Sequence, residues 1–445
     1  MIVINTINMS SISDKDYEDE DFINKILSSK GLSGLTNMGN TCYMNAGLQC
    51  LFASPLLSVY FLKKKFTKQL KSNTTENLAK AHRKLHNKTD DDEIDFPRSE
   101  LISKIKQTVS YAYYKTIKGW IFENYDVEPV IFKENIGTHN ALFVGWSQND
   151  SQELINCTLD TLHEELKMSG EVEYKDIDSN VLTFRNGLSE YIGQLNNADI
   201  TDDAKARVIH KLRTFIISRM YEYVNYVAID QWNKFIRKDY SIIREIFSSM
   251  LYTEITCKKC NIPSLNFELA LMLTLCLPKD KNELTLDDCL EFNYCSKEFL
   301  TNKDQYQCTN CKSYNDAEKV TYIWELPELL IIHFKRFSNE MIGRMCRMRK
   351  DGAFVKYPLK SLDMSKYLSK YNKKSAMYDL YGVVHHHGSL NGGHYTASCR
   401  SFINQEWFNF NDSSVSLIHR ENDIVSESGY ILFYQKRYDE IDDSE

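Results

Sequence analysis

The sequence has no long apolar run and no excess of positive charge. None of its apolar stretches approaches the ~18 consecutive residues that a membrane-spanning helix needs. Residues 1–5 carry neither the basic flank nor the apolar segment of a secretory signal. Acidic residues outnumber basic ones by 61 to 54, so a net charge of −7 offers no broad positive field for a phosphate backbone. We therefore expect an intracellular protein, cytoplasmic or nuclear, with no membrane and no nucleic-acid partner.

The composition is that of a folded protein. Hydrophobic residues make up 42% of the chain and charged residues 26%, which is enough to bury a sizeable core. A chain of 445 residues is too long to fold around one compact core, which suggests two or three lobes. The twelve cysteines of an intracellular protein are expected to be metal ligands, a nucleophile or buried thiols rather than disulfides.

Patterns along the chain place helices mainly in the first half and strands in the second. Apolar residues at helical spacing predict a helix over 152–167, with Asp150 able to cap its first turn. Leucine and phenylalanine alternate with other residues over 265–277, which predicts one continuous strand. Residues 63–95 have the composition of a surface insertion, and residues 169–227 that of a helical insertion.

Two pairs of cysteines share the CxxC spacing, namely Cys257 with Cys260 and Cys308 with Cys311. Each CxxC turn places two thiolates at one corner of a tetrahedral zinc site, so two turns complete a structural site. The alternative is four unrelated buried thiols. The spacing predicts a structural zinc ion, with the strand over 265–277 forming part of a ribbon between the two turns.

Cys42 follows a run of turn-forming residues and begins an apolar helical pattern. We therefore expect it at the N-terminus of a helix, where backbone N–H groups stabilise a thiolate and depress the pKa of the thiol. Such a position suits a nucleophile. The alternative is a small buried cysteine with no chemical role.

His394 directly follows Gly392 and Gly393, and a predicted strand ends at Asn411 soon afterwards. The glycines remove side-chain bulk and leave the imidazole approachable by an extended chain. Asn411 can bind one ring nitrogen and leave the other to act on a thiol, as in cysteine proteases. The alternative is a structural histidine in a strand.

Together these motifs resemble the ubiquitin-specific protease family, a papain-like group of deubiquitinating cysteine proteases. Residues 34–45 look like the cysteine box of the family, and residues 378–381, 392–395 and 410–415 look like its histidine box. Residues 148–154 resemble its glutamine–aspartate segment and residues 326–337 its central strand. The likeness covers residues 32–435 in family order, with the CxxC turns where the family carries its fingers.

The resemblance implies an α+β, papain-like cysteine protease fold whose active cleft lies between two lobes. The implied parts are a helical thumb lobe over 32–168, the helical insertion over 169–227, a zinc-ribbon finger subdomain over 245–325 and a β-rich palm lobe over 326–435. Acidic segments, expected to be solvated, flank them at 1–31 and 436–445.

The resemblance also implies roles for individual residues. Cys42 is the nucleophile and His394 its general base. Asn411 orients the imidazole where many relatives have aspartate, and the neighbouring Asp412 can share that role. Asn37 donates a hydrogen bond to the oxyanion.

The implied partner is ubiquitin or a ubiquitinated protein, bound by a monomer. Asp150 would pair with the arginines of the ubiquitin tail, although helix capping is a sufficient role for it. The residues implied to contact the tail are Asp150, Gln148, His386, Gly392, Gly393 and Tyr395.

Two other functions fit the same residues. One is a ubiquitin-binding module that does not cut its ligand, and the other is a protease for a ubiquitin-like modifier. A zinc hydrolase built on His385, His386, His387 and His394 fails, because no HExxH helix or paired acid supports a catalytic metal.

Overall fold

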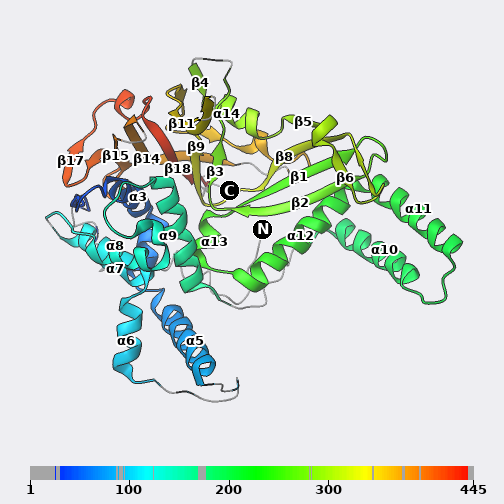
Figure 1. Cartoon of the computed structure of the whole chain (residues 1–445), viewed down its shortest axis with the longest axis horizontal. Coiled ribbons are helices and arrows are strands. Elements are labelled where there is room, and N and C mark those ends of the chain that lie inside the picture. The colour runs from blue at the N-terminus through cyan, green and yellow to red at the C-terminus, as the bar shows by residue number, and fades with distance from the viewer. Residues whose placement is uncertain are drawn as a thin grey trace, which may run out of the picture.

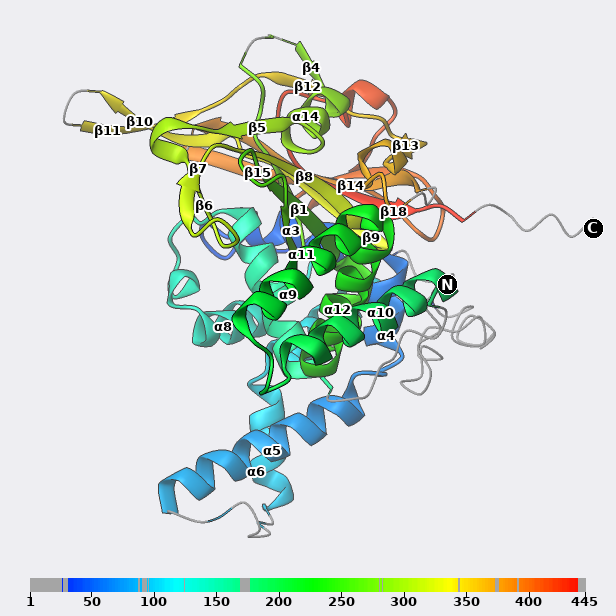
Figure 2. The same ribbon diagram turned by 90° about the vertical axis from the view of Figure 1, so that its right-hand side faces the viewer.

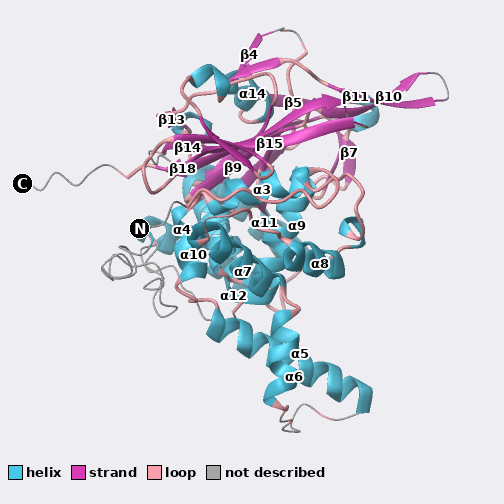
Figure 3. Ribbon diagram, turned by 90° about the vertical axis from the view of Figure 1, so that its left-hand side faces the viewer, coloured by secondary structure: helices cyan, strands magenta, loops and turns pink. Residues whose placement is uncertain are grey.

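Helices occupy the first half of the chain and strands the second, as the patterns predict (Figure 1). The structure, a computed structural model, describes residues 26, 31–86, 89, 94, 96–123, 125–168, 177–279, 281, 283–342, 345–372, 376–389 and 392–438. Most of the expected acidic segments, at 1–31 and 436–445, therefore lie outside the described residues. Figure 3 separates the two kinds of element into a helical lobe and a strand-rich lobe.

The helical lobe is built around two helices that bury their apolar residues against each other. These are α3 (Cys42–Phe52), buried along its whole length, and α9 (Ser151–Leu166), which matches the predicted helix. Around them lie α4 (Pro55–Leu62), α5 (Thr67–His86), α6 (Arg98–Lys106), α7 (Val109–Phe122), α8 (Val130–His139) and η2 (Ala141–Phe143). Among the described helices, none is by itself long and apolar enough to cross a membrane; α3 and α4 qualify only as a pair bent by 89°.

The strand-rich lobe contains an eight-stranded sheet, which we call the palm sheet. Its main path runs β17-β16-β15-β14-β18-β9-β3, with β13 also paired to β14. The bounds are β3 (Leu273–Leu275), β9 (Leu329–Phe334), β13 (Leu362–Asp363), β14 (Met377–Ser389), β15 (Gly392–Arg400), β16 (Trp407–Asn411), β17 (Ser414–Leu417) and β18 (Gly429–Lys436). Helix α3 packs on β14, β15 and β16, so the two lobes meet along this helix.

A second sheet of four strands, the finger sheet, extends away from the palm sheet (Figure 1). Its order is β2 (Pro263–Ala270), β1 (Ser249–Cys257), β8 (Ala317–Glu325) and β5 (Lys297–Leu300), all antiparallel. The remaining short elements are β4 (Glu283–Thr285), α14 (Leu286–Asn293), η3 (Asn302–Asp304), β6 (Tyr306–Cys308), β7 (Ser313–Asn315), β10 (Phe337–Ile342), β11 (Met345–Lys350), β12 (Phe354–Lys356), η4 (Ser365–Tyr367) and η5 (Glu421–Asp423).

The prediction of one continuous strand over 265–277 is wrong. Strand β2 ends at Ala270 in the finger sheet, and β3 begins at Leu273 in the palm sheet, where it runs parallel to β9. In both β2 and β3 exposed residues alternate with more buried ones along most of the strand, so the alternation of apolar residues continues across the junction and gives no sign of the change of sheet.

The helical insertion consists of α10 (Ser179–Leu195), α11 (Asp202–Ser218) and α12 (Met220–Asp239), followed by α13 (Ile242–Phe247). The expected helices are present, and they continue beyond 227. Val224 and Ala228 of α12 pack against Tyr252, Phe267 and Trp324, so α12 covers one face of the finger sheet.

Candidate active site

Cys42 is the first residue of α3, as the sequence predicts, and its side chain is only 4% exposed. The expected depression of its pKa is wrong for this arrangement. Burial raises the pKa of the Cys42 thiol above its ordinary value, and the charge of Asp412 raises it further, while hydrogen bonding to backbone at Tyr395, Tyr43 and Cys42 itself lowers it. The cost of burying a thiolate thus outweighs the favourable helix N-terminus.

The strand expected at His394 is present, and so is the strand that ends at Asn411. Strand β15 begins at Gly392, and pairing of Ala397 with Phe410 in β16 brings the end of β16 alongside. The Nε2 atom of His394 lies 2.7 Å from Oδ1 of Asn411. Because a carbonyl oxygen only accepts, Nε2 carries the proton, and Nδ1 of the neutral ring keeps a free lone pair.

Cys42 and His394 come together from positions 352 residues apart. The thiol of Cys42 interacts with the backbone of Tyr395, the residue that follows His394. Within the described part of the chain, no hydrogen bond joins the Cys42 sulfur to the imidazole of His394. The two groups are therefore neighbours across the junction of the lobes without a direct bond.

Asp412 lies beside the site, and among the described residues its hydrogen-bond partners are other than the imidazole of His394. Its carboxylate accepts hydrogen bonds from Nδ2 of Asn37 at 2.9 Å and from Nδ2 of Asn45 at 2.8 Å. Its backbone oxygen accepts from the N–H of Leu35 at 3.0 Å. A Cβ atom on Gly34 would lie 2.4 Å from the Ser413 carbonyl oxygen, so only glycine permits this close approach of the two boxes.

Asn37 has a fixed orientation. Its Oδ1 accepts from the backbone N–H groups of Gly39 at 3.0 Å and Thr41 at 3.1 Å, and one proton of its amide goes to Asp412. A side-chain amide carries two protons, so one remains for another acceptor. Asn45 is the last residue of the cysteine box, and the sequence gives no indication of its hydrogen bond to Asp412.

Asp150 caps α9, which confirms its structural role. Its Oδ1 accepts from the N–H of Gln152, and its Oδ2 accepts from the hydroxyl of Tyr430, each at 2.7 Å. Burial raises the pKa of the Asp150 carboxyl, while these two hydrogen bonds lower it. The sequence does not predict this role of Tyr430, because nothing in a strand pattern indicates which distant residue a tyrosine hydroxyl will bind.

The other expected channel residues form one cluster next to the site. Nε2 of Gln148 donates to the carbonyl of Gly393 at 3.3 Å. The ring of His386 is 3% exposed and lies 4.6 Å, between centroids, from the ring of Tyr395. Burial lowers the pKa of His386 to about 4, so this imidazole is neutral near pH 7.

Gly392 and Gly393 differ in what surrounds them. A Cβ atom on Gly393 would lie 2.1 Å from Nε2 of His386, whereas one on Gly392 would reach only the hydroxyl of Ser389, at 4.0 Å. The glycine at 393 is therefore required by the packing of the protein itself.

The four cysteines of the CxxC turns form one cluster at the end of the finger sheet. Their sulfur atoms all lie within 4.8 Å of one another, and those of Cys260 and Cys308 are 3.8 Å apart. Four sulfurs at ~2.3 Å from a tetrahedral zinc ion are about 3.8 Å apart, so the spacing fits that ion. The four thiols could hold a metal, as the spacing predicts.

The two turns have the same backbone. The residue after each second cysteine, Asn261 or Lys312, has a φ of 53° and donates its N–H to the carbonyl of the first cysteine of its turn, at 2.8 and 2.7 Å. Only one other group among the described residues could hold a metal, formed by His163, Glu164 and Asp239. The histidines at 385–387 and 394 belong to neither of these two groups of described residues.

Comparison with known proteins identifies relatives along almost the whole chain. The family model described as "Ubiquitin carboxyl-terminal hydrolase" matches residues 33–434. Ubiquitin carboxyl-terminal hydrolase 2 of Bos taurus is 30% identical over 410 residues, which are 92% of this chain and 55% of the relative. A probable ubiquitin carboxyl-terminal hydrolase of Acanthamoeba polyphaga mimivirus is 29% identical over 437 residues, covering 91% of this chain and 90% of the relative. The chain thus spans about half the length of the bovine relative.

Solved structures show the same fold. The SAGA Ubp8/Sgf11/Sus1/Sgf73 deubiquitinating module bound to ubiquitin aldehyde matches with a TM-score of 0.60 at 24% identity, covering 94% of this chain and 73% of that chain. The same module bound to monoubiquitin matches with a TM-score of 0.59 at 24% identity, covering 92% and 70%. The predicted α+β, papain-like fold is confirmed, and the chain belongs to the ubiquitin carboxyl-terminal hydrolase family.

Proposed function

We propose that the chain is a deubiquitinating thiol protease that hydrolyses the isopeptide or peptide bond after the C-terminal glycine of ubiquitin. One observation carries this proposal. The thiol of Cys42 lies against the backbone next to His394, and Asn411 holds the imidazole with Nδ1 free. Family membership and the likeness to structures bound to ubiquitin support the choice of substrate.

In the first step His394 takes the proton of Cys42 through Nδ1, and the thiolate attacks the carbonyl carbon of the terminal glycine. The resulting imidazolium then protonates the leaving lysine amine, which leaves a thioester on Cys42. Water, activated by the same imidazole, hydrolyses the thioester and restores the thiol. The hydrogen bond to Asn411 keeps the ring in the tautomer that these transfers need.

The tetrahedral intermediate carries its negative charge on oxygen. Asn37 supplies the donor, because its amide is fixed by Gly39 and Thr41 and has one proton beyond the one bound to Asp412. Removing one such donor in a protease costs ~3 kcal/mol of transition-state stabilisation. Asp412 acts here as a positioning residue for Asn37 rather than as the orienter of His394.

The tail of ubiquitin runs through the cluster of Gln148, Asp150, His386, Gly393 and Tyr395. Both oxygens of Asp150 already accept one hydrogen bond each, and each keeps a lone pair for an arginine of the tail. Gly392, which is exposed and has open space around it, leaves room for an extended chain.

The four cysteines hold a structural zinc ion. Zinc would fix the turns that end β1 and β6 and so stabilise the outer end of the finger sheet. It has no part in the bond cleavage, since the chemistry is carried by Cys42 and His394.

One specific observation favours a second candidate, a ubiquitin-binding module without activity. The pKa of the Cys42 thiol is raised, and no hydrogen bond links its sulfur to His394 among the described residues. Such a protein would bind ubiquitin through the same cluster but leave its C-terminal bond intact.

Hydrolysis of ubiquitin carrying a fluorogenic amide at its C-terminal glycine separates the candidates. The wild-type chain should release the fluorophore, while Cys42→Ala and His394→Ala should not, although both should still bind ubiquitin. Binding without release by the wild type would establish the inactive module. Release from a ubiquitin-like modifier but not from ubiquitin would change the substrate and keep the protease.

A further inference from the structure

Positive charge is concentrated in one part of this acidic chain. Residues 63–118 contain fourteen lysines and arginines against seven acidic residues, a net charge of +7, while the whole chain carries −7. Five of the seven acidic residues fall in the sequence 90–95. These residues include α5 and α6, which form a pair that we call the arm. Composition averaged over the whole chain conceals this segregation.

The arm stands out from the helical lobe. Figure 1 shows α5 and α6 extending away from the palm sheet, and Figure 2, turned by 90°, shows the same projection. Only Leu70 and Ala79 of α5 are buried, and no residue of α6 is. At 1.5 Å per residue, the 20 residues of α5 span about 30 Å.

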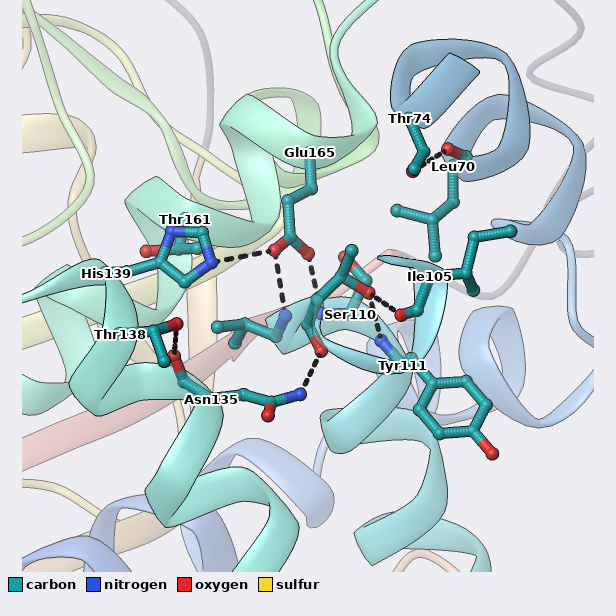
Figure 4. Close-up of polar contacts among 12 residues, drawn as sticks. Leu70, Thr74, Ile105, Ser110, Tyr111, Asn135, Thr138, His139, Thr161 and Glu165 are labelled. Carbon is teal, nitrogen blue, oxygen red and sulfur yellow. Dashed lines mark hydrogen bonds and ion pairs between the residues drawn. The ribbon is translucent and has the colours of Figure 1, made fainter. Parts of the chain in front are cut away.

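The root of the arm is held by polar contacts to the body, part of which Figure 4 shows. Glu165 accepts from the N–H groups of Val109 and Ser110, at 2.8 and 2.7 Å, and so caps the helix that follows α6. Nδ2 of Asn135 donates to the carbonyls of Lys106 and Thr108, at 3.0 and 2.8 Å.

The other side of the root is held in the same way. Nδ2 of Asn73 donates to the carbonyls of Glu165 and Lys167, at 3.0 and 2.8 Å. Bonds on both sides fix the direction in which the arm projects.

Eight lysines and arginines of this segment have no ion-pair partner among the described residues. All eight are exposed: Lys68, Lys71, Lys84, Arg98, Lys104, Lys106, Lys115 and Lys118. Exposed positive charges attract a polyanion, and several of them close together attract it jointly.

We propose that the arm binds double-stranded nucleic acid through its phosphate backbone, without reading the base sequence. Lysines suit phosphate as point charges, and contacts to phosphate carry no sequence information. This proposal differs from the expectation, drawn from the net charge of the whole chain, that nucleic acid is not a partner. Because the arm lies away from the palm sheet, binding there leaves the proposed cleft free.

The exposed side chains of the arm argue against two other partners, a membrane surface and single-stranded nucleic acid. Leu85 and Ile102 are its only large apolar side chains that are exposed among the described residues, whereas a helix that lies on a membrane needs a continuous apolar face. Among the described residues of α5 and α6, no phenylalanine, tyrosine or tryptophan is exposed to offer the stacking platform that single-stranded nucleic acid uses.

The test compares two variants of the full chain with equal charge. The arm variant carries Lys68→Gln, Lys71→Gln, Lys104→Gln and Lys106→Gln; the control carries Lys205→Gln, Lys211→Gln, Lys303→Gln and Lys360→Gln, also at exposed positions. Binding to a fluorescein-labelled 30-base-pair DNA is followed by anisotropy between 50 and 300 mM salt. A duplex RNA of equal length tests whether phosphate alone is recognised.

We expect the wild type and the control to bind both duplexes, with affinity that falls steeply with salt. Each lost phosphate contact reduces the slope of log affinity against log salt concentration by about 0.9. The four substitutions of the arm variant should therefore reduce the magnitude of that slope by about 3 to 4. No binding by the wild type at 50 mM salt, or an equal loss in the control, would overturn the proposal. So would binding only to vesicles containing phosphatidylserine. Hydrolysis of the fluorogenic ubiquitin should be equal in all three proteins.

Discussion

Asn37 donates a hydrogen bond from its side-chain amide to the carboxylate of Asp412 at 2.9 Å, across 375 residues of sequence. The contact joins the start of the chain to the end of β16 and lies beside the thiol of Cys42, whose pKa the charge of Asp412 raises. Asp412 therefore holds the proposed oxyanion donor in place and also makes the thiolate harder to form.

Replacement of this carboxylate separates the two effects. Asp412→Asn keeps the size of the side chain but removes the charge and one acceptor for the amides of Asn37 and Asn45. We expect hydrolysis of the fluorogenic ubiquitin to fall by about 10- to 150-fold, as a hydrogen bond to a charged group contributes ~1.5–3 kcal/mol. The pKa of Cys42 should fall, because the nearby negative charge is gone. A titration of thiol reactivity that shows a higher pKa would contradict this assignment.

The local patterns gave the elements that carry the candidate site. The helix start at Cys42, the cap at Asp150, the strand after Gly393 and the strand end at Asn411 all follow from turn residues and periodicity over short windows. Each CxxC turn brings two thiols together within four residues, and the pairing of Cys257 in β1 with Ala317 in β8 brings the two turns together.

What the sequence could not provide is set by contacts between distant segments. The pKa of Cys42 depends on how deeply the palm sheet buries it, and the partner of Asp412 is a residue far away in sequence. The apolar alternation gives no sign of the break between β2 and β3, because both strands carry the same alternating pattern. The hydrogen bond from the hydroxyl of Tyr430 to Asp150 is likewise a contact between residues far apart in the sequence.

The two glycines before His394 provide a matched pair of variants. In Gly393→Ala the new methyl group would lie 2.1 Å from Nε2 of His386, so the ring or the strand must move. We expect a loss of ~1–3 kcal/mol in the free energy of unfolding, as for overpacking elsewhere, and weaker ubiquitin binding. The free energy of unfolding of Gly392→Ala should lie within ~0.5 kcal/mol of the wild-type value, because position 392 is exposed. Equal denaturation midpoints for the two variants would show that His386 does not constrain residue 393.

The pKa of Cys42 sets how its reactivity changes with pH. Burial holds that pKa above the ordinary 9.0, so the thiolate fraction rises about tenfold per pH unit throughout the neutral range. Alkylation of Cys42 by iodoacetamide in the free protein, followed by mass spectrometry of its peptide, should accelerate from pH 6 to pH 9 without levelling off. A plateau below pH 7 would mean that a thiolate–imidazolium pair already exists in the free protein.

Removal of the proposed zinc should affect the finger sheet before the cleft. The double variant Cys257→Ser and Cys308→Ser keeps the size of the side chains but lacks two of the thiolates that zinc needs. We expect loss of about one zinc per chain and faster proteolysis within residues 249–325. The pair Cys50→Ser and Cys399→Ser, two buried thiols 3.7 Å apart elsewhere, should keep the metal. Metal analysis of the native protein that finds no zinc would refute the site.

Covalent capture by ubiquitin tests the central claim most directly. A ubiquitin with an electrophile at its terminal glycine requires the tail to enter the cleft and the sulfur of Cys42 to attack, with His394 taking the proton. Mass spectrometry should find one ubiquitin per chain bonded to Cys42, no adduct in Cys42→Ala and a much slower one in His394→Ala. Failure of the wild-type protein to form the adduct, or its persistence in Cys42→Ala, would contradict the account.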